Sequence, residues 1–149
     1  APAVLVERLN TESRARLVTL IEGAPLMAAA RLLRAGTDIV AVCKAEGALV
    51  GVITKTDVVA RISECHGATC AAAASLAMTE EVVTCRPGDW LHEVWSTMKA
   101  RELKNIPVVN DDARPIGILN ARDALQALLG EVENEEVLLR DYIMGIGYR

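Results

Sequence analysis

The sequence predicts an α/β (α+β) fold of two pseudo-symmetric repeats, each a small mixed sheet with helices packed on it. Three observations lead to this prediction: paired β-branched segments, a long internal repeat, and apolar stripes at helical spacing. The chain has 149 residues, of which 52% are hydrophobic, so it can bury a core and is not intrinsically disordered. No apolar run reaches the length of a membrane span, and no signal peptide is visible.

The β-branched segments form two pairs with the same internal spacing. The first pair covers residues 39–43 and 49–53, and the second covers 106–109 and 116–119. A polar turn separates the two members of each pair, which is typical of hairpins or adjacent strands. A further short strand is expected ahead of each pair, at 17–20 or 82–85.

The two pairs belong to a longer internal repeat. An offset of 66 residues places Gly51 on Gly117 and Asp57 on Asp123. Upstream the offset is 65, so one residue is gained or lost near Gly36. A repeat of this length that occurs only twice indicates a pseudo-twofold domain.

Helices are expected between and after the strands. Pro25 and Gly36 mark the two ends of the first predicted helix. Four apolar stripes are Leu26, Ala29, Ala30 and Leu33; Leu91, Val94, Trp95 and Met98; Val58, Val59, Ile62 and Cys65; and Ala124, Leu125, Leu128 and Leu129. Each repeat therefore reads strand, helix, strand, strand, helix. We expect a first repeat with an N-terminal segment at 1–69, a second at 70–130, and a C-terminal helix or tail at 131–149 that caps the fold or contacts a partner chain.

The repeats resemble a tandem pair of CBS domains, the family named after cystathionine β-synthase. The family pattern is an apolar strand often carrying Pro-Val, a turn, a Gly between apolar residues, and Thr or Ser separated by two residues from an Asp that opens a helix. The matching segments are Gly51-Val52-Ile53-Thr54-Lys55-Thr56-Asp57, Ile106-Pro107-Val108-Val109 and Gly117-Ile118-Leu119-Asn120-Ala121-Arg122-Asp123. The resemblance covers roughly residues 9 to 130. It implies a central cleft that binds adenosine-containing ligands, and a dimer shaped like a flat disc.

The chain departs from this pattern at two positions. Ala41 stands where the first repeat would have Pro, which is harmless because Pro is optional at such a strand position. Asn120 replaces Thr or Ser in the second repeat and turns a sugar-facing hydroxyl into an amide. The second change would weaken that site or alter its ligand.

The residues of this motif suit an adenine nucleotide. A carboxylate at Asp57 can accept from both ribose hydroxyls, and a helix N-terminus favours phosphate. The guanidinium of Arg122 also suits phosphate oxygens, so S-adenosylmethionine is a less favoured ligand. Adenine would lie between apolar strand residues. The expected ligand-binding residues are Thr19, Ile39, Val40, Thr54, Lys55, Thr56, Asp57, Thr84, Asn105, Ile106, Asn120, Arg122 and Asp123.

The same residues have a purely structural interpretation. Thr54-x-x-Asp57 before an apolar run is also a helix capping box. Asn120 is a good N-cap residue in its own right. The sequence leaves both interpretations open.

Several function classes are disfavoured. A net charge of −4, no basic stripe and few aromatic residues argue against nucleic-acid binding. No P-loop, GxGxxG or nucleophile–His–Asp set is present, so we expect no enzymatic activity. Cys65, His66 and Cys70 lack a fourth ligand at a recognised zinc spacing, so we expect no metal. The four cysteines are too few for a secreted disulfide framework, which favours a cytoplasmic protein.

Two functional hypotheses follow. In the first, the chain is a regulatory module that binds AMP, ADP, ATP or NAD between its repeats and signals to a separate effector protein by a change of conformation. In the second, it is a structural or protein-interaction dimer without a physiological nucleotide. Both expect a homodimer and no membrane partner.

Overall fold

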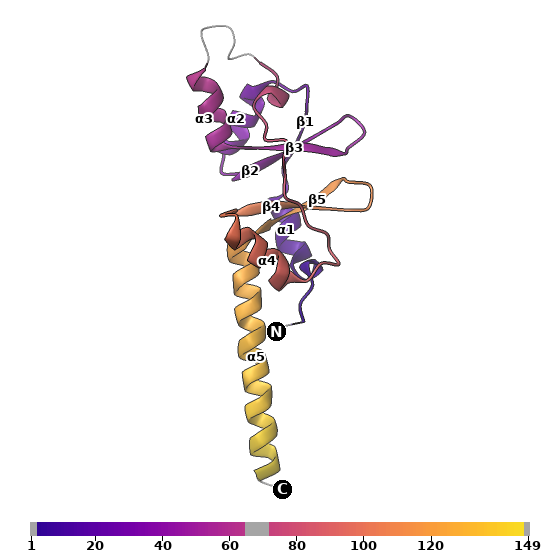
Figure 1. The fold of residues 1–149 in the computed structure, drawn as a ribbon, viewed down its shortest axis with the longest axis vertical. Coiled ribbons are helices and arrows are strands. Elements are labelled where there is room, and N and C mark those ends of the chain that lie inside the picture. Colours follow the sequence, from indigo (N-terminus) through magenta and orange to yellow (C-terminus); the bar gives the residue numbers. More distant parts are fainter. Residues whose placement is uncertain (1–2, 65–71, 148–149) are drawn as a thin grey trace.

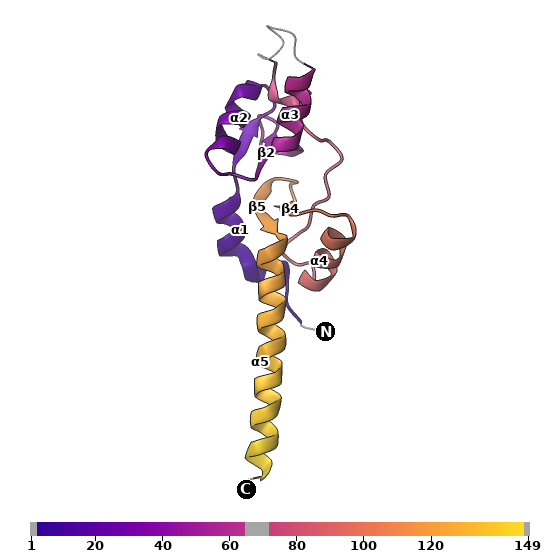
Figure 2. The same ribbon diagram turned by 90° about the vertical axis from the view of Figure 1, so that its left-hand side faces the viewer.

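The computed structural model describes residues 3–64 and 72–147. Two α+β halves lie one above the other, with their sheets where the halves meet and a long helix projecting from the second half (Figures 1 and 2). The elements in chain order are η1 (Val6–Leu9), α1 (Asn10–Arg16), β1 (Thr19–Ile21), α2 (Leu26–Arg34), β2 (Ile39–Cys43), β3 (Leu49–Thr54), α3 (Lys55–Ser63), η3 (Ala74–Leu76), α4 (Leu91–Ala100), β4 (Asn105–Val109), β5 (Pro115–Asn120) and α5 (Ala121–Gly147).

The two predicted strand pairs are antiparallel hairpins in the same register. β2 pairs with β3, placing Val42 opposite Gly51, and β4 pairs with β5, placing Val108 opposite Gly117. Each hairpin has a register shift directly after that valine. In the first half β1 adds to β2 in parallel, and α2 supplies the crossover that a parallel connection needs. The internal repeat of the sequence therefore corresponds to a repeated hairpin of the same register.

The strand predicted at 82–85 is wrong. Only Cys85 pairs there, through a single parallel bridge to Val108. Directly after it, the Arg86 N–H donates to the Asp89 carboxylate at 2.8 Å, and the chain turns away from β4. Pro87 in this turn has no N–H to continue a ladder. The second sheet consequently has two strands, β4 and β5, among the described residues.

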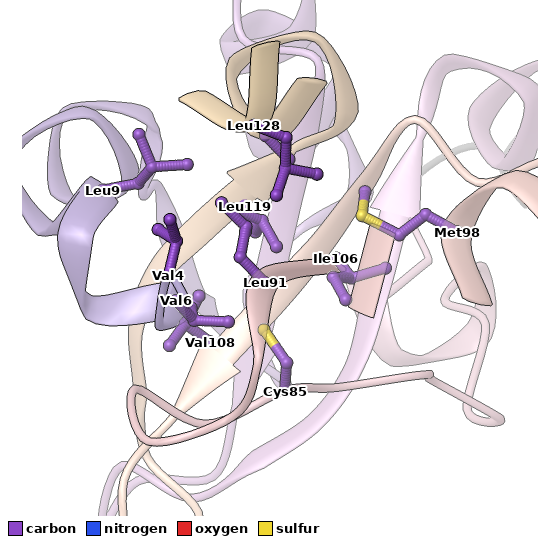
Figure 3. Packing of buried hydrophobic residues seen from close by; sticks show 11 residues of the cluster. Val4, Val6, Leu9, Cys85, Leu91, Met98, Ile106, Val108, Leu119 and Leu128 are labelled. Atoms are coloured by element: carbon purple, nitrogen blue, oxygen red, sulfur yellow. The ribbon is translucent and has the colours of Figure 1, made fainter. Parts of the chain in front are cut away.

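The segments that precede β1 and α4 are exchanged between the halves. The N-terminal segment packs on the second half, where Val4, Val6 and Leu9 join a core with Leu91 and Leu128 (Figure 3). The Leu91 N–H donates to the carbonyl of Val4 at 2.8 Å.

The connector between the repeats makes the reciprocal contact. It packs on the first half, where Ala74 is fully buried beside Leu26, and the Leu26 N–H donates to the carbonyl of Ala72 at 2.8 Å. Each half is therefore completed by the segment that leads into the other.

Two equivalent glycines make this exchange possible. A Cβ on Gly51 would lie 2.7 Å from the Met78 sulfur and 2.8 Å from the Thr79 carbonyl oxygen. A Cβ on Gly117 would lie 2.6 Å from the Ser13 hydroxyl oxygen. The repeated glycine therefore marks the place where an exchanged segment crosses the hairpin.

Only parts of the predicted helical stripes are buried. In α2, Leu26, Ala29 and Leu33 are buried as expected, after Pro25 as N-cap. The stripes on α3 and α5 are half wrong, because the outer face of each helix has no neighbour among the described residues. The buried members are Val58, Ala124 and Leu128, and the exposed members are Val59, Ile62, Leu125 and Leu129. Cys65 lies outside the described residues.

The predicted C-terminal helix is the continuation of α5. The helix runs without a break from Ala121 to Gly147, and its second part extends away from both halves (Figure 1). Among the described residues, no helix combines the length and the apolar composition needed to cross a bilayer.

Candidate functional site

The cleft between the halves contains two adjoining cavities. The first has a volume of about 350 Å³ and is lined by both halves, through Thr37 and Ile39 of the first, Asn105 and Ile118 of the second, and Arg16 of the N-terminal segment that packs on the second. The second has a volume of about 490 Å³ and lies at the N-termini of α3 and α5. Its lining residues are Asp38, Ile39, Thr54, Lys55, Thr56, Glu102, Leu103, Lys104, Asn105 and Asn120. Asp38, Ile39 and Asn105 line both cavities.

Thr54 and Asp57 form the capping box that begins α3. The backbone N–H of Thr54 donates to Asp57 Oδ2 at 2.8 Å, and the Thr54 hydroxyl oxygen accepts from the N–H of Asp57. The other carboxylate oxygen, Asp57 Oδ1, accepts from the hydroxyl of Thr79 at 3.0 Å. The capping interpretation is thus confirmed for these two residues. In this capping box, Asp57 is half-buried beside the second cavity and accepts hydrogen bonds from neutral donors.

Asn120 begins α5 in the same way. Its Oδ1 accepts from the backbone N–H groups of Arg122 and Asp123, at 3.0 and 3.2 Å. Its Nδ2 donates to Asn105 Oδ1 at 3.0 Å, across the β4–β5 pair. The amide therefore acts as an N-cap and also fixes a second polar side chain at the cavity wall.

Asp123, the counterpart of Asp57, is held by a cation. Arg16 Nε lies 2.7 Å from Asp123 Oδ2, and an Nη of the same guanidinium lies 3.2 Å from Oδ1. The hydrogen bond to Asp123 raises the pKa of Arg16, while partial burial acts in the opposite direction. This two-point geometry is the strong form of an arginine–carboxylate pair.

The structure brings together six of the expected ligand-binding residues. Those that line the two cavities are Ile39, Thr54, Lys55, Thr56, Asn105 and Asn120. Asp57, Arg122 and Asp123 lie in the first turns of the adjacent helices.

The remaining expected residues lie elsewhere. Val40 and Ile106 are core residues of the first and second half, so only their backbone can face a ligand. Thr19 lines a separate groove with Lys44 and Arg114. Thr84 is exposed, one residue before the bridge at Cys85.

Sequence reasoning missed several residues of the cleft, among them Arg16 and Asp38, and also Thr79, which donates to Asp57. None belongs to the repeated motif. Arg16 and Thr79 sit in the exchanged segments, whose destination depends on how the halves are assembled. No local sequence pattern marks their pairing with the carboxylates that begin α5 and α3.

Within residues 3–64 and 72–147, no group of three or more His, Cys, Asp or Glu side chains is arranged to hold a metal. Cys65, His66 and Cys70 lie outside the described residues.

Two like halves that share a cleft, each with a helix opened by a carboxylate-bearing motif, define a tandem α+β module. The family model for the CBS domain matches the chain twice, over residues 8–64 and 73–130. The chain therefore belongs to the CBS-domain family and carries a tandem pair of these domains.

Comparisons with individual proteins agree on the fold. The uncharacterized protein MJ1225 of Methanocaldococcus jannaschii is 32% identical over 66 residues, which cover 44% of this chain and 23% of that protein. The chain thus matches less than a quarter of the length of this relative.

Two solved structures superpose over most of the chain. The CBS domain pair of MJ0100, in complex with 5′-methylthioadenosine and S-adenosyl-L-methionine, is 23% identical with a TM-score of 0.70, covering 87% of this chain and 98% of that one. CBSX2 in complex with AMP is 23% identical with a TM-score of 0.71, covering 85% of this chain and 96% of that one.

Proposed function

We propose that this chain is a non-catalytic regulatory module that binds an adenine nucleotide, AMP, ADP, ATP or NAD, in the cleft between its CBS repeats. The observation that carries the proposal is the pair of equivalent carboxylates, Asp57 and Asp123, in the first turns of two helices whose capping residues, Thr54 and Asn120, line the second cavity. The ligands in complex with MJ0100 and CBSX2 share the adenosine group, which supports this ligand class for a CBS pair.

The groups around the cleft match the parts of a nucleotide. Either carboxylate can accept from the ribose hydroxyls, and Ile39 and Ile118 offer apolar surface to the base. The N-terminus of α3, together with the exposed side chains of Lys55 and Lys104, favours phosphate. Because such a ligand touches both halves, its binding shifts their relative position, and a separate effector protein reads that shift.

Isothermal titration calorimetry with AMP, ATP, NAD and S-adenosylmethionine tests the proposal. We expect heat of binding with at least one nucleotide, and a rise in melting temperature at saturating ligand. Asp57→Asn and Asp123→Asn together should abolish binding without unfolding the chain. Asp111→Asn, on a turn where the carboxylate is 95% exposed, is the matched control and should bind normally. Neither heat nor a thermal shift with any of these ligands would refute the proposal.

We also propose a homodimer, which is central to the alternative function as an interaction protein. The supporting observation is the uncovered outer face of α3 and α5, where Val59, Ile62 and Leu129 are 65%, 54% and 52% exposed. Exposed apolar side chains on one helix of each half mark an interaction site, and a second copy carries the same surface.

Sedimentation velocity tests the dimer. The unmodified chain should sediment as a dimer, and Leu129→Glu should give a folded monomer. Gln126→Glu, an exposed change on the same helix, should stay dimeric. A dimer without any nucleotide binding would favour the interaction protein over the regulatory module, and a monomeric unmodified chain would exclude the dimer.

A further inference from the structure

We infer that Arg16 makes the Asp123 side of the cleft selective for adenosine ligands that carry a phosphate. The inference rests on the proposed function and assigns a ligand class to one of its two half-sites. It starts from the position of the guanidinium. Arg16 lines the first cavity, whereas Asp123 is not among the lining residues of that cavity. The side chain of Asp123 is 16% exposed and that of Arg16 is 37% exposed. A ribose in the cavity therefore reaches the carboxylate only after Arg16 has moved.

Moving Arg16 separates a two-point ion pair. The ribose hydroxyls replace the donors that Asp123 loses, but they offer no counter-charge to the guanidinium. A phosphate on the same ligand supplies that counter-charge, because its oxygens accept the two guanidinium hydrogen bonds that the carboxylate accepted before. A phosphate-bearing ligand thus exchanges one charged partner for another, whereas adenosine supplies no charged group in place of Asp123.

Asp38 is the other charged group that faces this arginine. It lines the same cavity, and its carboxylate favours the charged form of Arg16. Asp38 keeps the guanidinium at the cavity after the pair with Asp123 opens, but it also repels an incoming phosphate. Replacing it with Asn should therefore tighten the binding of AMP.

The Asp57 half-site has no arginine at the position equivalent to Arg16. The offset of 65 residues that relates the exchanged segments places Glu81 at the position of Arg16. Asp57 instead accepts from the hydroxyl of Thr79, an exposed neutral donor that a ribose replaces without breaking an ion pair. Among the described residues, Asp57 forms no salt bridge. The two half-sites therefore have the same fold and opposite charge at one equivalent position.

Calorimetry with AMP and adenosine, two ligands that differ only by the phosphate, tests the inference. The background is Asp57→Asn, which leaves Asp123 as the only motif carboxylate. Here we expect AMP to bind about tenfold tighter than adenosine. Arg16→Met should weaken AMP and maintain or strengthen adenosine, so that the preference falls to near unity. Arg14→Met, on the exposed side of α1, is the matched control and should keep the preference.

Arg16→Lys provides a second variant if the Met variant is unstable. Lysine retains the positive charge but cannot donate the paired hydrogen bonds of a guanidinium. We therefore expect a reduced preference for AMP over adenosine, and this preference should weaken with added salt. An unchanged ratio of AMP to adenosine affinity in both Arg16 variants would overturn the inference while leaving the proposed function intact. So would binding of AMP by the unmodified chain together with none in the Asp57→Asn background. Failure of all adenosine ligands with the unmodified chain would instead remove the proposed function.

Discussion

Gly117 of β5 lies directly beneath Ser13 of α1, so close that a Cβ on the glycine would come within 2.6 Å of the serine hydroxyl oxygen and 2.9 Å of its Cβ. Ser13 is 5% exposed in this contact. The pair fixes the N-terminal segment to the second half, as Gly51 and Met78 fix the connector to the first.

Gly117→Ala should lower the free energy of unfolding by about 1–3 kcal/mol, as overpacking of a close contact does. The serine cannot simply rotate away, because its backbone carbonyl carbon also lies 3.1 Å from the added Cβ. Urea unfolding followed by circular dichroism measures the change. Gly88→Ala is the control, since nothing lies within 4 Å of its added Cβ, and it should be near neutral. Equal effects of the two substitutions would contradict the close-contact explanation.

Val6→Ala should destabilise the chain by about 2 kcal/mol, because the side chain is 2% exposed within the core of the second half. Glu7→Ala, the exposed neighbour, should change stability by less than about 0.5 kcal/mol. Thermal unfolding of both variants measures the difference. A Val6 variant as stable as the unmodified chain would show that the N-terminal segment is not part of this core.

Thr54→Val should cost about 1 kcal/mol through loss of the capping box of α3. Thr54→Ser retains the hydroxyl and should restore most of the stability. Thr56→Val, two residues further and exposed, controls for the change of residue type. Urea midpoints of the three variants are the measurement, and a Thr54→Ser variant as unstable as Thr54→Val would argue against the cap.

The thiols of Cys43 and Cys85 should resist modification. Burial raises the pKa of both, that of Cys85 to about 12. In a variant with Cys65 and Cys70 replaced by Ser, a disulfide reagent at pH 8 should react slowly in buffer and rapidly with both thiols in urea. Rapid reaction of both thiols in buffer would contradict their burial.

The same pKa shift gives a pH dependence of stability. The folded pKa of Cys85 lies above its ordinary value of 9.0, so the unfolded chain deprotonates first. This contribution is complete below about pH 9 and is lost as pH rises toward 12. Cys85→Ala should therefore reduce the loss of stability on that alkaline side, as measured by urea midpoints at pH 8 and pH 10.5. An unchanged pH dependence would exclude this role for the thiol.

The strands and the pseudo-twofold relation could be predicted because their signals are local. β-branched runs around polar turns fix each hairpin, and the shared nine-residue spacing from Val42 to Gly51 and from Val108 to Gly117 fixes their equivalence. The strand at 82–85 failed because its apolar pattern matched the first repeat, whereas pairing there ends at the turn after Cys85.

The cleft could be predicted only in part. The motif located Thr54, Asp57, Asn120 and Asp123, because a cap and a ligand site require the same residue types at the same helix start. Their partners could not be inferred in this way. Arg16 meets Asp123 from 107 positions away in the chain, through an exchange of segments that has no periodic signature.

The long helix α5 begins at the cleft and ends far from both halves. Its first turn carries Asp123, Ala124 and Leu128 are buried against the second half, and Glu131 pairs with Arg8 at 3.7 Å. The part of the helix beyond projects away from both halves (Figure 1). At 1.5 Å per residue, the 27 residues of α5 reach about 40 Å. A tilt of the helix by about 5° at its N-terminal end would displace its C-terminal end by roughly 3–4 Å, because the displacement grows with the length of the helix. A helix movement too small to detect at a bound nucleotide would thus become a measurable displacement at the far end of α5, where paired spin labels would report it.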